Sequence, residues 1–335
     1  MGRPRRHLLA LAVAIGSTLA LAACSGSSDS ASPATTASSA RSTVASTTKA
    51  FHCTPPADGH RTITVGGVAR SFEVAAPTTY RRRAPLVVLL HGYGGSATEI
   101  GATTGLLKTG PSDGVVVAAP LALGNPSSWG IIDGFAADQA FIDDVIAQVT
   151  ASSCVDPEQV VIAGFSAGSA MTGVYGCSRA DKVAALVMVS GLPPAICPKD
   201  HTPRVLVVNG TADATVPFGG GNQPVNNGVI PLKSVPDSVA SWAQGAGCSG
   251  GPADTKVGRD VTMRAWTACA HGGPVDLMIV EGGPHAWPGS VSLSPTGTNS
   301  QTVSVSCVVR TIAAEPDASV STVAASCPGE GPKDP

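Results

Sequence analysis

The chain has 335 residues, of which 43% are hydrophobic and 13% are charged, and its formal net charge is −2. The segment from residue 51 to about residue 316 is long enough for one sizeable core, and no internal repeat divides it. The slightly acidic charge balance argues against nucleic acid as a partner.

Residues 1–23 have the pattern of a secretory signal, with basic residues, then an apolar run, then small residues. The run ends in "LAAC", which resembles a lipobox and predicts that Cys24 is acylated; ordinary signal cleavage is the alternative. Residues 24–50 are rich in Ser, Thr and Ala and predict a flexible linker. We therefore expect an exported protein that is anchored by lipid to the outer face of the cell membrane. Partial secretion is the alternative.

Eight cysteines remain after Cys24, and an even number in an exported chain predicts disulfides. Sequence alone does not choose the connectivity. Pairing neighbours along the chain would close loops of about 20 residues each. These favoured pairs are Cys177–Cys197, Cys248–Cys269 and Cys307–Cys327. No C-x-x-C spacing is present, so neither zinc nor thioredoxin-like chemistry is expected.

Short, Val-rich apolar runs predict the strands. In chain order they are residues 61–65, 72–76, 86–90, 115–119, 160–163, 184–189, 205–208 and 275–280. Unbroken runs such as "LVVLL" and "VLVVN" suit strands that are covered on both faces, which indicates a parallel centre. The first two runs alternate and are joined by Gly66 and Gly67, as in an edge hairpin.

Between the strands, "DGFAADQAFIDDVIAQVTASS" carries an apolar stripe at helical spacing. Alternating strands and helices predict an α/β fold with a mostly parallel sheet of about eight strands and helices on both faces. The Pro-rich connection over residues 190–204 leaves no room for a lid domain, so we expect an open site. The predicted catalytic domain covers residues 51–318, followed by a tail over residues 319–335.

A candidate nucleophile lies in "VVIAGFSAGSAMTGVYGC", residues 160–177. G-x-S-x-G between a strand and a helix predicts a nucleophile elbow, in which flanking glycines permit a sharp turn that exposes Ser166. A second match surrounds Ser249, but it follows no apolar run and Gly-Gly-Pro cannot continue as a helix. Ser249 is therefore predicted to lie in a loop.

The base and the acid are expected at the ends of later strands, in the order Ser, acid, His. Asp213 follows "RVLVVNG" and His285 follows "VDLMIVEGGP", so these residues complete a predicted triad with Ser166. Asp133 and Asp138 are the alternatives for the acid.

The turn "HGYGG" at residues 91–95 predicts part of an oxyanion hole. We assign the two amide donors to Tyr93 and Ala167, with Gly94 as the alternative to Tyr93 and a structural role for His91. Three aromatic residues are candidates for the substrate pocket, with plain core packing as the alternative: Trp129, Phe165 and Trp287.

The motifs "LLHGYGGS", "VVIAGFSAGSAMT", "VSG", "VNGTADATVPF" and "GGPHAWPG" resemble, in this order, an esterase family of the α/β-hydrolase superfamily. That family includes polyhydroxybutyrate depolymerases, feruloyl esterases and LpqC-like lipoproteins. The resemblance implies the same triad at Ser166, Asp213 and His285. The chain departs from the family at Asn209, where "HGTAD" is common, and at residues 302–314, where a helix is implied but β-branched residues disfavour one.

The sequence thus predicts a serine carboxylesterase that cleaves feruloyl-type or polyhydroxyalkanoate-type esters through an acyl-enzyme, with no metal or cofactor. Small or polymeric esters would be its substrates. Two alternatives remain: a catalytically silent envelope lipoprotein that binds a polysaccharide or protein, and a serine peptidase.

Overall fold

The computed structural model describes residues 51–130, 134–191, 201–225, 228–290 and 299–329. The chain divides into two units, residues 1–48 and 49–335. The signal, Cys24 and the linker lie outside the described residues and stay predictions. Among the described helices, none has the length and apolar character needed to cross a membrane.

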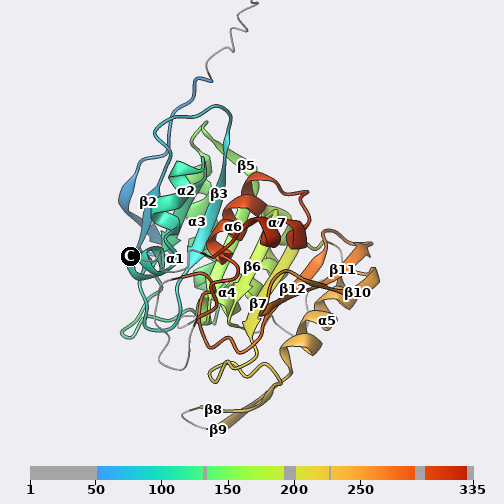
Figure 1. Ribbon diagram of the computed structural model, residues 1–335. Helices are drawn as coiled ribbons and strands as arrows, with labels where there is room; N and C mark the ends of the chain where they lie inside the picture. Colours follow the sequence, from blue (N-terminus) through green and yellow to red (C-terminus); the bar gives the residue numbers. More distant parts are fainter. Residues whose placement is uncertain (1–50, 131–133, 192–200, 226–227, 291–298, 330–335) are drawn as a thin grey trace, which may run out of the picture. The chain divides into compact units, whose positions relative to one another are not determined.

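One large sheet dominates the second unit (Figure 1). Its strands run in the order β1 (Gly59–Val65), β2 (Val68–Ala75), β4 (Val116–Pro120), β3 (Ala84–Leu90), β5 (Val155–Phe165), β6 (Ala185–Val189), β7 (Arg204–Gly210), β12 (Val275–Val280), β11 (Val261–Cys269) and β10 (Cys248–Lys256). From β4 to β12 all neighbours pair in parallel. Antiparallel pairs flank this centre on both sides, and β1 forms the predicted edge hairpin with β2. The parallel centre is confirmed.

The sheet has ten strands rather than about eight, because β10 and β11 extend it. Strand β10 reads "CSGGPADTK" and is mostly exposed, so it carries no apolar pattern. It forms by pairing with β11, with Cys248 opposite Cys269 in register and bonded to it. Ser249 therefore lies in a strand, and the loop predicted for it is wrong. A separate hairpin of β8 (Gly221–Val225) and β9 (Gly228–Leu232) was also not predicted.

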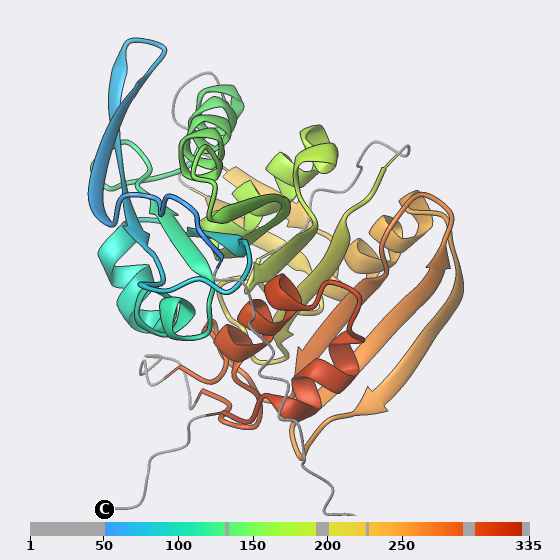
Figure 2. The same ribbon diagram turned by 90° about the horizontal axis from the view of Figure 1, so that it is seen from above.

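Helices cover both faces of the sheet (Figure 2). On one face the core includes residues of α3 (Ala136–Thr150), α4 (Ala167–Ser178) and α5 (Val235–Gly245). On the other it includes residues of α1 (Ala97–Thr104), α2 (Leu106–Ser112), α6 (Val305–Ala314) and α7 (Val320–Ser326). The stripe predicted for α3 buries Phe141, Ile142, Val145 and Val149.

Helices α6 and α7 belong to the core. Helix α6 forms despite its β-branched residues, with the hydroxyl of Ser304 accepting a hydrogen bond from the amide of Cys307 at its start. Its valines are buried against the sheet, which outweighs the weak propensity. Helix α7 also buries apolar residues, and the Cys307–Cys327 disulfide ties it to α6. The catalytic unit therefore extends past the predicted boundary at residue 318.

Two of the three favoured disulfides are confirmed, Cys248–Cys269 and Cys307–Cys327. A further bridge joins Cys53 to Cys154 and fixes the start of the unit beside the sheet. The pair predicted for Cys177 involves residue 197, which lies outside the described residues.

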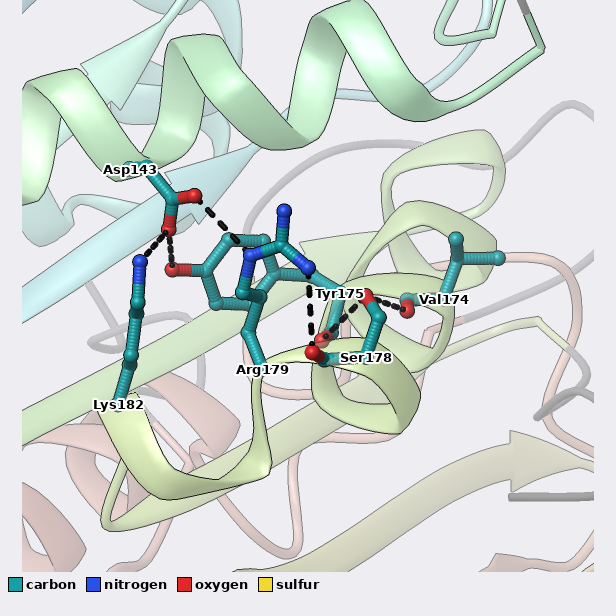
Figure 3. Close-up of polar contacts among 6 residues, drawn as sticks. All are labelled: Asp143, Val174, Tyr175, Ser178, Arg179 and Lys182. Atoms are coloured by element: carbon teal, nitrogen blue, oxygen red, sulfur yellow. Dashed lines mark hydrogen bonds and ion pairs between the residues drawn. The ribbon is translucent and has the colours of Figure 1, made fainter. Parts of the chain in front are cut away.

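A partly buried cluster of polar side chains joins α3 to α4 (Figure 3). The carboxylate of Asp143 accepts hydrogen bonds from the hydroxyl of Tyr175 at 2.7 Å, from Lys182 at 2.8 Å and from Arg179 at 3.1 Å. Burial alone would raise the pKa of Asp143, but these hydrogen bonds outweigh it and hold the pKa below its usual value. The cluster fixes the position of α4, whose first turn begins directly after Ser166.

We expect Asp143→Ala to lower the free energy of unfolding by about 1–3 kcal/mol, because the hydroxyl of Tyr175 loses its acceptor. Urea denaturation measures the loss, and Asp144→Ala, at the exposed neighbouring position, should change stability by less than about 0.5 kcal/mol. The folded-state pKa of Asp143 is depressed, so its contribution is present above the ordinary carboxyl pKa and fades as pH falls through the folded value. Equal effects of the two substitutions would contradict this role.

Candidate active site

Ser166 occupies a sharp turn between β5 and α4. Its φ of 54° and ψ of −115° are unusual for a residue with a side chain. A Cβ at Gly164 would lie 2.1 Å from the carbonyl oxygen of Gly168, and one at Gly168 would lie 2.3 Å from that of Leu90. Both glycines of the motif are therefore needed for the strand, the turn and the helix to approach so closely.

The three predicted triad residues meet at one edge of the sheet. Ser166 follows β5, Asp213 follows β7 and His285 follows β12. The distance from Nε2 of His285 to Oγ of Ser166 is 3.0 Å, and that from Nδ1 to Oδ2 of Asp213 is 2.9 Å. The side chain of Asp213 is fully buried, and that of His285 is 16% exposed. These distances permit a continuous chain of hydrogen bonds.

Asp213 is held in place by the turn that carries it. Its Oδ1 accepts the backbone amides of Thr215 and Val216, both at 2.8 Å, which leaves Oδ2 for His285. With the Nδ1 proton donated to Asp213, the lone pair of Nε2 faces the hydroxyl of Ser166. The arrangement can take a proton from that hydroxyl.

The alternative residues lie elsewhere. Asp138 pairs with the buried Arg70 at 2.7 Å and accepts the amide of Gly130 at 2.6 Å, so its carboxylate is committed to other groups. Asp133 lies outside the described residues. The hydroxyl of Ser249 donates to the carbonyl of Ala268 on the neighbouring strand.

Two backbone amides suit an oxyanion hole. Within the described residues, neither the amide of Tyr93 nor that of Ala167 donates a hydrogen bond. The amide of Gly94 donates to the carbonyl of Ser127 at 2.8 Å, so it is already used. This difference favours Tyr93 over Gly94. Ala167 is the first residue of α4, and the amides in the first turn of a helix have no hydrogen-bond acceptor within the helix.

His91 fixes the turn that carries Tyr93. Its Nδ1 lies 2.6 Å from the carbonyl oxygen of Gly92, and its Nε2 accepts the amide of Ala122 at 3.0 Å. Burial lowers the pKa of His91, against the hydrogen bond to Gly92, so the ring is neutral with its proton on Nδ1. The carbonyl of Gly92 and the amide of Tyr93 belong to one peptide group, and His91 therefore sets the direction in which that amide points.

The three aromatic residues that were candidates for the substrate pocket fall into two groups. Trp129 and Trp287 are 6% and 2% exposed, and their indole N–H groups donate to the carbonyl of His91 and the hydroxyl of Ser306. For both tryptophans, these observations favour core packing over a place in the substrate pocket. Phe165 is half-buried, and its ring centre lies 5.0 Å from that of His285, so it remains beside the candidate site.

Ser190 is a supporting residue that the sequence did not reveal. It is buried after β6, with a φ of 49°, and its hydroxyl donates to the carbonyl of Ala286 at 3.0 Å. Ala286 is the neighbour of His285, so this bond fixes the loop that carries the imidazole. A serine followed by glycine is too common for its pattern to indicate this role.

Fold and geometry together define an α/β-hydrolase, and the comparisons agree. No family model matches the chain. A putative esterase, NocK of Nocardia uniformis subsp. tsuyamanensis, is 32% identical over 320 residues, which cover 86% of this chain and 91% of the relative. The chain belongs to this family of α/β-hydrolase esterases, which are carboxylic-ester hydrolases.

Other relatives carry more specific names. Feruloyl esterase B of Piromyces equi is 30% identical over 219 residues, which cover 61% of this chain but only 40% of that protein. Feruloyl esterase C of Emericella nidulans is 27% identical, with 68% and 82% of the two chains covered. An acetyl xylan esterase from Aspergillus awamori superposes with a TM-score of 0.52 at 14% identity, over 68% of this chain and 94% of that one, which shows the shared fold. None of these comparisons tests the likeness to LpqC-like lipoproteins.

We expect Ser190→Ala to lower kcat/KM for a p-nitrophenyl ester about tenfold with little change in KM, because the loop of His285 loses a buried hydrogen bond. Steady-state kinetics measures this. Ser178→Ala removes an exposed hydroxyl that also bonds a carbonyl, at the far end of α4, and should leave kcat/KM unchanged. Parent-like kinetics of the Ser190 variant would show that the bond does not position the imidazole.

Proposed function

We propose that the chain is a serine carboxylesterase that acts through an acyl-enzyme. The observation that carries the proposal is the hydrogen-bonded series from Asp213 through His285 to Ser166, beside the unused amides of Tyr93 and Ala167. Membership of the family supports the reaction class, and this geometry supports the choice of residues.

In the proposed reaction, Nε2 of His285 takes the hydroxyl proton of Ser166 as the oxygen attacks the ester carbonyl. The amides of Tyr93 and Ala167 bind the oxyanion that forms. Collapse breaks the bond to the alcohol, which leaves with the proton from His285. Water then attacks the acyl-enzyme by the same route and releases the acid. Asp213 orients the ring of His285 and stabilises the imidazolium.

A feruloyl-type ester is our first choice of substrate, with a polyhydroxyalkanoate-type ester as the second. Relatives named as feruloyl esterases support the first choice. The half-buried ring of Phe165 lies beside the imidazole, and the side chain of Tyr93 is 67% exposed next to the proposed oxyanion hole. Both rings offer a face to an aromatic acyl group.

We also propose that the protein is exported and anchored through Cys24. The lipobox-like "LAAC" and the linker support this, and the disulfides of the second unit fit an oxidising compartment. Labelling cells with an alkyne fatty acid should mark the parent in the membrane fraction, whereas Cys24→Ala should be unlabelled and released. A labelled Cys24 variant, or an unlabelled parent, would contradict the anchor.

The decisive experiment compares residues 51–335 with Ser166→Ala on p-nitrophenyl acetate. We expect the variant to lose more than about a thousandfold in kcat, as triad removal does elsewhere. Ser249→Ala is the matched control, because Ser249 lies in the other G-x-S-x-G sequence and should be dispensable. Methyl ferulate, a hydroxybutyrate oligomer and a peptide amide in the same assay separate the substrate classes.

Two results would overturn the proposal. Hydrolysis of the peptide amide without preference for esters would favour the serine peptidase. Absence of any turnover by folded parent protein, combined with polysaccharide binding that Ser166→Ala retains, would favour the catalytically silent lipoprotein.

A further inference from the structure

A cavity lies at the opposite edge of the sheet from the proposed catalytic residues. It has a volume of about 680 Å³ and opens where β6, β7 and β12 begin. Ser166, Asp213 and His285 follow the carboxyl ends of the parallel strands, whereas this cavity lies at their amino ends. Because β7 contains seven residues, the two sites are roughly 20 Å apart. This cavity is therefore a separate feature, and its role does not depend on the proposed function.

Arg204 lines this cavity, and two nitrogens of its guanidinium have no hydrogen-bond acceptor among the described residues. The residue is 9% exposed, and its Nε and Nη1 are buried without a partner in the described part of the chain. Among the described residues, no carboxylate forms an ion pair with it; Asp276 and Asp317 act on it only through their charge. A buried cation with unused donors is costly, so the site is incomplete without an acceptor.

Asp276 faces the same side of the sheet. It pairs in register with Leu206, two residues after Arg204, and side chains two apart on a strand share a face. The residue is 5% exposed. Burial raises the pKa of Asp276 to about 7, against the charge of Arg204, which lowers it. Near neutral pH this carboxyl group therefore balances the charge of the guanidinium only in part.

We propose that this cavity binds a small monocarboxylate with an apolar body, held by the guanidinium of Arg204. Guanidinium and carboxylate match in geometry and charge. Asp317, on the cavity wall and exposed, disfavours anions of higher charge such as phosphate.

The remaining walls fit the apolar body. They are formed in part by Val183, Pro203, Pro274 and Pro316. Such a surface can cover a ring or a short aliphatic chain.

Benzoate is the probe that tests the proposal, with benzamide as its uncharged equivalent. Titration calorimetry of the full chain should detect benzoate binding and no benzamide binding. Arg204→Met should weaken benzoate binding by at least about tenfold, because it removes the charge and the donors. Ser166→Ala should bind benzoate as the parent does. In ¹⁵N spectra, the amides of Thr267 and Gly273, which line the cavity, should shift with benzoate.

Arg204→Gln gives a second variant if the Met variant does not fold, since it keeps a polar end but loses the charge; it too should lose benzoate binding. Circular dichroism in the near ultraviolet checks that each variant is folded. The proposal fails if the parent does not bind benzoate, if both folded Arg204 variants bind it like the parent, or if the spectral shifts lie only around Ser166 and His285.

Discussion

Parallel alignment of β5, β7 and β12 is the constraint on which the candidate site depends. Parallel strands end at one edge of a sheet, so the residues that follow them are brought together whatever their separation in sequence. Ser166 and His285 are 119 residues apart and yet within hydrogen-bond distance. The alignment places the three side chains near one another, but it does not by itself determine their orientation.

Buried hydrogen bonds fix the orientation of these side chains. Both oxygens of Asp213 are occupied, one by backbone amides and one by His285, so the carboxylate cannot rotate without losing bonds. His91 and Ser190 act in the same way on two neighbouring loops, each through a carbonyl oxygen. Arg204 at the opposite edge is the contrast, because its buried donors have no such acceptor.

The departures from the predicted fold share one cause. Strand β10 has no apolar pattern and exists through its pairing with β11 and the Cys248–Cys269 bridge. Helix α6 has weak propensity and exists because its valines pack on the sheet and Ser304 caps its start. In both segments tertiary contacts outweigh local preference, and those contacts cannot be read from neighbouring residues.

By itself the sequence determined the parallel centre of the sheet, the nucleophile turn and the order of Ser166, Asp213 and His285. The first two follow from local physics: unbroken apolar runs need burial on both faces, and a turn this tight needs glycine at residues 164 and 168. The order of the three residues follows the pattern of α/β-hydrolases. Only the tertiary structure showed that the amide of Gly94 is already bonded, that Trp129 and Trp287 are buried, and that Ser190 is bonded to the His285 loop. Those outcomes depend on contacts between residues far apart in the chain, which no local pattern records.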